Sequence, residues 1–504
     1  IISPPPLFMK KNNFLLPVLF LTIFFSTTAQ NRPNIILMMA DDLGWGDTGY
    51  NGNKVIQTPH LDQMAAEGVR MNRFYAASAV CSPTRASVLT GRNPYRTGVF
   101  SANQGILRPE ETTLSEILKE EGYATGHFGK WHLGTLTHTE KEANRAKPGN
   151  LATFNPPSEH GYMDAFVTEA KIPTYNPMIH TDIKNPNSPI NGTPFGTSYW
   201  DIDGNKVTSN LEGDDSRIIM DRVLPFIDTA TSQNKPFVAV VWFHAPHKPC
   251  VAGPRHLELY KDQKLSMQHY AGCITAMDEQ IGRLRKYLAA EGLDKNTLLT
   301  FCSDNGPENG NPGSSGPFRQ RKRSMHEGGI RVPGLLVWPE KFKTPIVSNA
   351  PFVTSDYLPT IMDALSIKQD PNIVLDGESM LPLLTGEKET RTAPVNCMLS
   401  YKLASQNKKY KLYAENQVFK LYDMEKDSLE RVNIAEKHPE LLNDMKASFV
   451  DWLSTVQSSF KGKEYGTVSL ERTDQKWNSP LTVKQKVRKN KKNKKTKKEQ
   501  ANKQ

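Results

Sequence analysis

The chain has 504 residues, of which 38% are hydrophobic, and a formal net charge of +10. This length and apolar fraction allow a large core and more than one structural unit. The charge does not indicate a nucleic-acid-binding protein, because residues 484–504 hold ten Lys and one Arg against one Glu, which accounts for the whole +10. Such a block is typical of a disordered, solvated tail. An electrostatic tether to an acidic polymer or membrane surface is the alternative.

An export signal is predicted at residues 1–29. Met9-Lys10-Lys11 gives a charged start, residues 14–25 are an apolar run, and Thr27-Thr28-Ala29 offers small residues for cleavage. The run is shorter than the roughly 20 apolar residues of a transmembrane helix. We therefore predict an exported protein, periplasmic or secreted, without a transmembrane anchor.

The first predicted strand, residues 34–40, ends in Asp41 and Asp42. Two adjacent carboxylates at the end of a buried strand are costly unless a cation lies between them. Oxygen ligands of this kind are selected by Ca²⁺ and Mg²⁺. The alternative is a structural turn with solvated Asp side chains.

The stretch Cys81-Ser82-Pro83-Thr84-Arg85 places a thiol four residues before a permanent cation. Pro83 suits the first turn of a helix, so we predict a helix that has Cys81 at its N-terminus and continues through Leu89. A thiol there is favourably placed for ionisation or modification, and an anion there meets unpaired N–H groups. A buried Cys beside a surface Arg is the alternative.

Lys130 and His132 lie two residues apart in Gly129-Lys-Trp-His-Leu-Gly134. In extended backbone this spacing places both side chains on one face, and the flanking glycines permit close approach to a ligand. An ordinary loop is the alternative. Residues 135–210 are rich in Pro, Asn, Thr and Gly, which argues against long helices. We interpret them as an insert that shapes a substrate pocket, with Trp200 stacking on a sugar or, alternatively, packing in the scaffold.

Two further buried strands are predicted at 236–243 and 297–302, followed by His244 and by Asp304-Asn305. Three apolar runs therefore deliver polar side chains at their carboxyl ends, where ligands bind in open α/β sheets. From about Asp376 the pattern changes to that of a smaller α+β unit. It includes a hairpin of 409–413 with 419–422 and an amphipathic helix over 439–456.

Three stretches resemble the type I sulfatases. Residues 81–92 match the first signature of that family at nearly every position, and 129–134 closely resemble its second. Residues 322–333 match the element Lys-x4-Glu-Gly-Gly-Ile-Arg-Val-Pro. The resemblance extends from about Asn31 to about Leu453.

This resemblance implies an α/β fold of the alkaline phosphatase superfamily, in which a large mixed, mostly parallel sheet is sandwiched by helices. A catalytic domain is then expected at 30–375, with the insert at 135–210. It would be followed by a C-terminal α+β subdomain at 376–475 and the basic tail at 476–504.

The resemblance also implies a modified nucleophile and a metal. Cys81 would be oxidised to formylglycine by a formylglycine-generating enzyme, and the hydrate of this aldehyde would attack sulfur. One Ca²⁺ would be bound by four ligands: Asp41, Asp42, Asp304 and Asn305.

The remaining roles follow from the same resemblance. Arg85 and Lys130 would hold the hydrate in its reactive form, and His132 would take a proton as sulfate is released. His244 and Lys322 would bind sulfate oxygens and assist the departing alcohol.

We therefore predict an exported sulfatase that hydrolyses sulfate monoesters on polysaccharides or oligosaccharides, of algal ulvan or galactan type or glycosaminoglycans. The export signal, the insert and the basic tail favour such substrates over a small aryl ester. A phosphonate or phosphate monoester hydrolase of the same superfamily is one alternative, although such relatives tend to carry His in place of Asn305. A non-catalytic protein that binds sulfated glycans is the other alternative, and no nucleic-acid partner is expected.

Overall fold

The computed structural model describes residues 1–4, 32–181, 189–466, 477 and 479–482. The predicted signal peptide and basic tail fall almost entirely outside these residues, as does a short part of the predicted insert. The folded body begins at Pro33. Among the described residues, no helix combines the length and the apolar character needed to cross a membrane.

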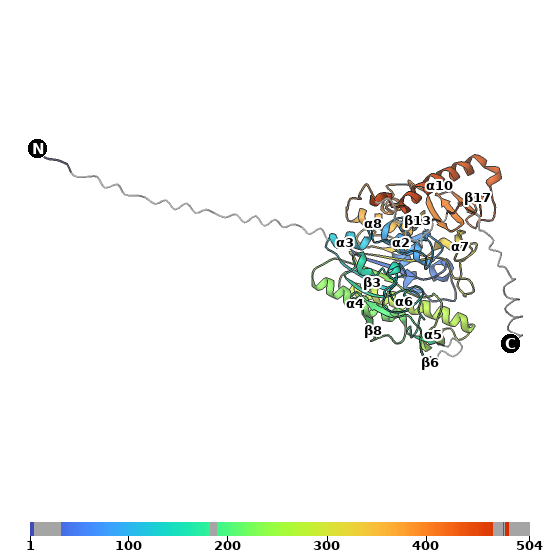
Figure 1. Ribbon diagram of the computed structural model, residues 1–504, viewed down its shortest axis with the longest axis horizontal. Coiled ribbons are helices and arrows are strands. Elements are labelled where there is room, and N and C mark those ends of the chain that lie inside the picture. The colour runs from blue at the N-terminus through green and yellow to red at the C-terminus, as the bar shows by residue number, and fades with distance from the viewer. Residues whose placement is uncertain (5–31, 182–188, 467–476, 478, 483–504) are drawn as a thin grey trace. The chain divides into compact units, whose positions relative to one another are not determined.

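A large mixed sheet forms the centre of the body (Figure 1). In the described chain its strand order is β11-β2-β12-β10-β1-β9-β3-β4-β7-β8, and β13 pairs with β2. The central strands β10, β1, β9, β3 and β4 are mutually parallel. The strands are β1 (Asn34–Ala40), β2 (Val69–Tyr75), β3 (Ala124–Lys130), β4 (Asp164–Thr168), β7 (Tyr199–Asp201), β8 (Lys206–Val207), β9 (Phe237–Trp242), β10 (Thr297–Ser303), β11 (Arg331–Val332), β12 (Gly334–Val337) and β13 (Ile346–Val353).

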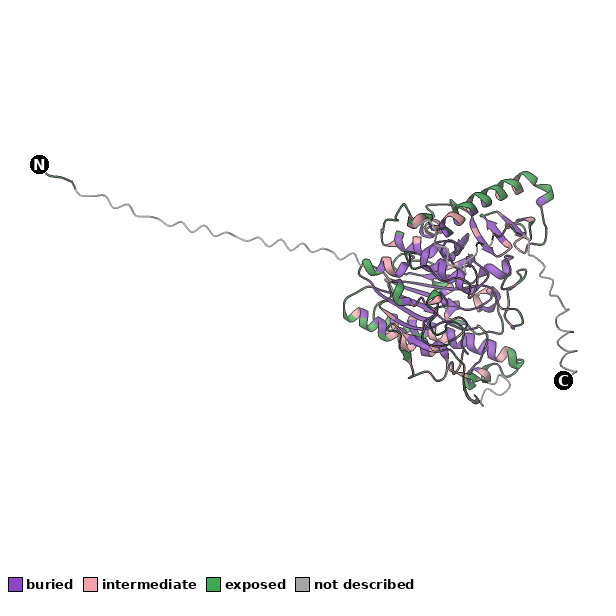
Figure 2. Cartoon of the chain, in the orientation of Figure 1, coloured by how far each residue is buried: buried purple, intermediate pink, exposed green. Residues whose placement is uncertain are grey.

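Both faces of this sheet are buried, which explains the continuous apolar sequence of its central strands. In β1, Ile35, Leu37 and Met39 enter one core cluster, whereas Ile36 and Met38 enter the other. Figure 2 shows buried residues throughout the sheet and exposed residues on the outer sides of the helices. The sandwich predicted from the sequence is therefore confirmed.

Two groups of helices cover the two faces (Figure 1). One face packs against α2 (Cys81–Thr90), α3 (Leu114–Glu120), α8 (Tyr357–Ala364) and α9 (Leu381–Leu384). The other packs against α1 (Pro59–Glu67), α4 (Asp215–Ser232) and α6 (Leu265–Ala290), and α5 (Pro254–Leu259) packs on α6. The remaining short helices are α7 (Glu327–Ile330) and the 3-10 turns Trp45–Asp47, Gly49–Asn51, Leu151–Thr153, Pro157–His160, Thr354–Asp356, Ala435–Lys437 and Lys463–Tyr465.

A smaller antiparallel sheet lies in the C-terminal part, as predicted. Its strands are β14 (Val395–Leu399), β15 (Lys402–Gln406), β16 (Tyr410–Glu415) and β17 (Val418–Asp423), and α10 (Pro439–Phe460) covers one face. The predicted hairpin is β16–β17. Its turn residues Asn416 and Gln417 have φ of 52° and 65°, the left-handed conformation that a two-residue hairpin turn requires.

The stretch 135–210 differs from the predicted insert. Long helices are absent from its described residues, as expected, but three of its strands extend the main sheet, and β5 (Ile179–Thr181) pairs with β6 (Pro189–Pro194). Trp200 is only 6% exposed, and its Nε1 donates to Glu142 Oε2 at 2.8 Å. The predicted sugar-stacking role of Trp200 is therefore wrong, because its ring packs in the core.

Candidate active site

Four neighbouring parallel strands bring distant segments to one edge of the sheet. Asp41 and Asp42 follow β1, Asp304 and Asn305 follow β10, and Lys130 ends β3. Because β1 is flanked by β10 and β9, and β9 by β3, the carboxyl ends of these strands lie side by side. The predicted convergence is thus present.

Cys81 begins α2, and all ten residues of this helix are buried. The thiol Sγ lies 3.5 Å from Asp41 Oδ1 and 3.6 Å from Lys322 Nζ. Burial raises the pKa of the Cys81 thiol, and the nearby Asp304 carboxylate raises it further. The predicted helix start is confirmed, whereas burial and the neighbouring carboxylates act against ionisation of the thiol itself.

Three buried cations face three buried carboxylates around this thiol. Lys130 Nζ lies 2.6 Å from Asp41 Oδ2, and Arg85 Nη2 lies 2.7 Å from Asp304 Oδ2. The third pair, Lys322 Nζ and Asp42 Oδ1, is 2.5 Å apart. The protein groups therefore balance one another in charge.

These contacts also determine which groups are ionised. Burial alone would raise the pKa of Asp41, but Lys130, Arg85 and Lys322 together hold it below its usual value. Arg85 is oriented further by the Trp242 ring, whose centroid lies 5.0 Å from the guanidinium carbon. Asp41 is thus an anion whose surroundings are positive.

The acidic end of this site fits a hard divalent cation. Within the described chain, Asp42 Oδ2 and Asn305 Oδ1 are buried and have no hydrogen-bond partner. Asn305 Nδ2 donates to Asp42 Oδ1 at 2.7 Å, and the Asp42 N–H donates to Asp304 Oδ1 at 3.0 Å. Asp42 has φ of 67°, a left-handed conformation that is uncommon for residues other than Gly and clusters at functional sites. Orphaned buried oxygens suit Ca²⁺ or Mg²⁺.

His132 is close to Lys130, but not through extended backbone. β3 ends at Lys130, and His132 has φ of 57°, so the predicted shared face is wrong. The turn is fixed by the His132 N–H, which donates to Glu169 O at 3.0 Å. Burial lowers the pKa of His132 well below 6.5, and Lys130 adds to the effect. Both effects favour the neutral form of the His132 imidazole over its charged form.

Asn103 fixes the orientation of this imidazole, and sequence reasoning missed it. Its Oδ1 lies 3.0 Å from His132 Nε2 and also accepts from Asn144 Nδ2 at 3.2 Å. Because a carboxamide oxygen is an acceptor, His132 Nε2 carries the proton. His132 Nδ1 is buried and has no partner among the described residues, so it is the atom that can accept a proton.

His244 is not brought to the reacting centre. Its Nδ1 lies 2.9 Å from Asp215 Oδ2 and its Nε2 lies 2.7 Å from Thr168 Oγ1, so both ring nitrogens are already engaged. The prediction that His244 binds a sulfate oxygen is therefore wrong: the resemblance was carried over to the first His of the loop, whose ring turns back into the core.

His247 takes the predicted place of His244. Its Nε2 lies 3.7 Å from Asp42 Oδ2, and its ligand atom falls within 4.8 Å of those of Asp41, Asp42 and Cys81. The Nδ1–H donates to Lys248 O at 2.7 Å, which leaves the Nε2 lone pair directed at the site. Burial lowers the pKa of His247 to about 3. The sequence signal for it was the second His of His244-Ala-Pro-His247.

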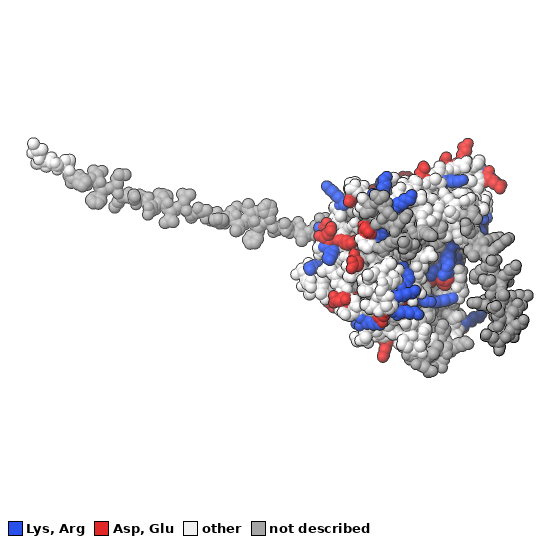
Figure 3. Space-filling model, in the orientation of Figure 1, with Lys and Arg blue, Asp and Glu red and all other residues white. Residues whose placement is uncertain are grey.

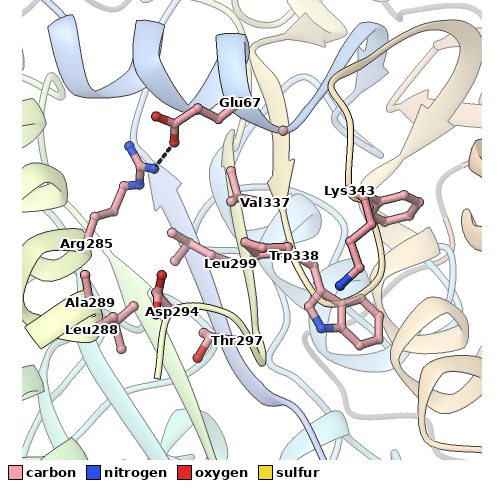
Figure 4. A pocket seen from close by; sticks show the side chains of 13 residues that line it. Glu67, Arg285, Leu288, Ala289, Asp294, Thr297, Leu299, Val337, Trp338 and Lys343 are labelled. Atoms are coloured by element: carbon pink, nitrogen blue, oxygen red, sulfur yellow. Dashed lines mark hydrogen bonds and ion pairs between the residues drawn. The ribbon is translucent and has the colours of Figure 1, made fainter. Parts of the chain in front are cut away.

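A separate cavity of about 400 Å³ lies at the opposite edge of the sheet. Figure 4 shows Glu67 and Arg285 joined across it, with Trp338 and Lys343 on another side. Thr297, the first residue of β10, lines this cavity, whereas Asp304 lies beyond the other end of the same strand. This cavity is therefore remote from Cys81.

Comparisons with known proteins agree with this geometry. The family described as Sulfatase matches residues 33–367, and that described as N-sulphoglucosamine sulphohydrolase, C-terminal, matches residues 316–455. The chain is 30% identical over 396 residues to N-acetylgalactosamine-6-sulfatase of Rattus norvegicus, covering 75% of this chain and 70% of the relative. It is 32% identical over 383 residues to arylsulfatase A of Homo sapiens, covering 73% and 71%.

A solved structure is similar over most of its length. The crystal structure of Ps i-CgsB in complex with k-i-k-neocarrahexaose superposes with a TM-score of 0.74 at 25% identity, covering 88% of this chain and 99% of that one. The fold, the site and these relatives define a sulfuric ester hydrolase of the alkaline phosphatase superfamily. The chain belongs to the sulfatase family.

Proposed function

We propose that this protein is an exported sulfatase that removes sulfate from sulfated polysaccharides or oligosaccharides, of algal ulvan or galactan type or glycosaminoglycans. It would act with formylglycine at position 81 and one Ca²⁺. The position of Cys81 carries the proposal, since its Sγ lies at a buried helix N-terminus between Asp41 and Lys322. Relatives named for N-acetylgalactosamine 6-sulfate and for a carrageenan oligosaccharide support a glycan substrate.

The metal would be held by oxygen ligands. Its ligands are proposed to be Asp41, Asp42, Asp304 and Asn305. The bound ion would supply positive charge that polarises the sulfuryl oxygens. Since the protein groups already balance in charge, this ion would make the site positive and suited to an anionic ester.

The side chain at position 81 would be the nucleophile. Formylglycine, as its hydrate, would supply the oxygen that attacks sulfur. Lys130 and Arg85 would hold this side chain through the carboxylates that they already contact. His132, protonated at Nε2, would accept at Nδ1 the proton of the remaining hydrate hydroxyl, so that the C–O bond to the sulfate breaks and the aldehyde re-forms, while Asn103 keeps the ring in place.

Lys322 and His247 would act on the substrate from the other side. The Lys322 ammonium, 3.6 Å from Cys81 Sγ, would bind a sulfate oxygen and offset its charge. His247 would take the role first assigned to His244, because its Nε2 is directed at the site. As the hydrate oxygen bonds to sulfur, the hydrate proton would pass to His247 Nε2 and from there to the ester oxygen, so that the S–O bond breaks and the alcohol leaves.

Maturation and transport complete the proposal. A formylglycine-generating enzyme would convert Cys81, and the segment 1–29 would direct export. The domain limits proposed are 30–375 for catalysis, 376–475 for the C-terminal subdomain and 476–504 for the basic tail. No observation favours the phosphonate or phosphate alternative, and Asn305 argues against it.

The test is a desulfation assay on purified protein. Wild type is expected to release sulfate from an aryl sulfate and from sulfated galactan or glycosaminoglycan oligosaccharides. Cys81→Ala should abolish release, whereas the matched control Cys397→Ala, in β14, should retain it. Turnover of phosphate but not sulfate esters would instead identify the phosphohydrolase. Binding of sulfated glycans without turnover would identify a binding protein.

A further inference from the structure

A second polar cavity adjoins the candidate active site. It has a volume of about 600 Å³, within the range of ordinary ligand pockets (roughly 300–1,000 Å³). Lys322, which contacts Cys81, also lines this cavity. Its apolar lining is limited to Tyr413 and Val418, so the cavity suits a polar occupant.

Two separate parts of the chain form its walls. One wall is the loop 319–326, which carries Lys322 and leads into α7. The other is the face of the C-terminal sheet that α10 does not cover. Tyr413 and Glu415 lie two residues apart in β16 and therefore share this face. Tyr413 is paired with Lys420 of β17, and Glu415 with Lys402 of β15. The cavity therefore exists only where the smaller sheet meets the catalytic part.

The lining is strongly basic. It holds five cations and one carboxylate, Glu415; the cations are Arg319, Lys322, Arg323, Lys402 and Lys420. Figure 3 shows Lys and Arg side chains gathered on the side of the molecule where α7 lies in Figure 1.

Only some of these cations form ion pairs with carboxylates of the protein. Arg323 pairs with Glu308, and Lys402 lies 3.5 Å from Glu415. Within the described part of the chain, Lys420 and Arg319 have no ion-pair partner; Arg319 donates only to the Glu430 carbonyl, at 3.3 Å. Like charges gathered in a concave site attract an anion and concentrate it there.

We infer that this basic cavity is a subsite for a second anionic group of the substrate, a sulfate or carboxylate on the sugar next to the one that is desulfated. The inference rests on the proposed function, because the first sulfate must lie at Cys81 while the neighbouring sugar occupies the cavity beyond Lys322. The protein would then prefer chains with an anion on consecutive sugars over a singly sulfated sugar.

Binding is measured first, in the Cys81→Ala background, which prevents turnover. The probes are a carrageenan tetrasaccharide, whose anions are sulfates, a chondroitin sulfate tetrasaccharide, which also has carboxylates, and N-acetylgalactosamine 6-sulfate. Adding Lys402→Ala and Lys420→Ala should weaken the binding of at least one tetrasaccharide by about tenfold or more, and should leave the affinity for the monosaccharide unchanged. The affected tetrasaccharide identifies the anion. Lys426→Ala, an exposed cation outside the cavity, is the matched control.

Unchanged affinity of the double variant for both tetrasaccharides would overturn the inference. The same two substitutions with Cys81 intact should leave aryl sulfate turnover unchanged, which shows that the fold and the reacting centre are preserved. The single variant Lys420→Glu, which has no described ion pair to break, should weaken tetrasaccharide binding further than Lys420→Ala. A different outcome is that wild type turns over no sulfate ester and still binds a tetrasaccharide in a way that depends on Lys402 and Lys420. That result would refute the proposed function but would still support an anion-binding site in the cavity.

Discussion

His244 and His247 are three residues apart and have opposite surroundings. His244 is fully buried, and both its nitrogens contact Asp215 and Thr168. His247 has one nitrogen directed at Asp42 and Cys81. The role of each His therefore depends on whether one ring nitrogen is left without a protein partner, and this is decided by how the chain packs.

Exchanging each His for Ala separates the two roles. His247→Ala should lower kcat by about 10²–10⁴-fold, the usual contribution of a general acid or base, with an unchanged melting temperature. His244→Ala removes the buried partner of Asp215 Oδ2, although the Tyr199 hydroxyl still donates to Asp215 Oδ1, and should cost roughly 1–3 kcal/mol of unfolding free energy. Sulfate-release kinetics and urea denaturation of both variants measure these effects. The reverse pattern would restore His244 to the site.

Asn103 should act as a positioning residue for His132. Replacing it with Asp puts a carboxylate beside His132 Nε2, which raises the pKa of the imidazole. Because His132 must be neutral to accept a proton, the acidic limb of the kcat–pH profile should move to higher pH. Asn103→Ala should lower kcat without this move. An unchanged profile in Asn103→Asp would show that His132 is not the base.

At the scale of elements, the adjacent ends of β1 and β10 create the acidic site. Neither strand end alone supplies enough oxygens, and their parallel pairing aligns Ala40 with Ser303, just before Asp41 and Asp304. Binding of an ion there would hold the two strand ends together and stabilise the fold.

Chelation tests this arrangement. Removing Ca²⁺ with EGTA should abolish sulfate release and lower the melting temperature, and added Ca²⁺ should restore both. A ligand at a hundredfold excess over its Kd stabilises the folded state by about 2.7 kcal/mol. Asn305→Ala should show a smaller melting shift on chelation. Equal activity and stability with and without EGTA would exclude the proposed metal.

Strand β16 joins the smaller sheet to the catalytic part through a buried charge. Lys411 Nζ lies 2.7 Å from Glu327 Oε1, at the start of α7, and 2.9 Å from Glu430 Oε1. Burial alone would raise the pKa of Glu430, but Lys411 and His326 lower it to about 2. Glu430 therefore contributes stability above its unfolded pKa of about 4.3, and this contribution is lost as pH falls through about 2.

Lys411→Ala should remove this link. The variant removes the shared cation of two buried carboxylates, which keep their contacts with Arg331 and His326, and should lose roughly 3–5 kcal/mol near neutral pH. The loss should shrink as the pH is lowered, because protonation then neutralises the carboxylates. Urea denaturation across this pH range measures the trend. Lys409→Ala, an exposed neighbour, should change stability by no more than about 0.5 kcal/mol. A loss independent of pH would contradict the role of the ion pairs.

Across the whole molecule, the sequence predicted which strands lead to the site more accurately than it predicted the side-chain contacts within the site. Apolar runs located β1, β9 and β10, and their polar ends located Asp41 and Asp304. Strands β7 and β8 were missed because they span only three and two residues. Asn103 and the burial of Arg85 could not be predicted either, since both depend on contacts between segments distant in the chain.

The fold also limits how residue 81 can be modified. Cys81 is 2% exposed and every residue of α2 is buried. An enzyme that oxidises this thiol needs access to the segment, so conversion is expected before the chain folds. Active and inactive protein could then share one fold and differ only at this side chain.

Peptide mass spectrometry of residue 81 in catalytically active protein tests whether an oxidised Cys81 is the nucleophile. We expect an aldehyde side chain at position 81, reactive towards a hydrazide, in a fraction of molecules that parallels the specific activity of each preparation. An intact thiol at position 81 in fully active protein would contradict it.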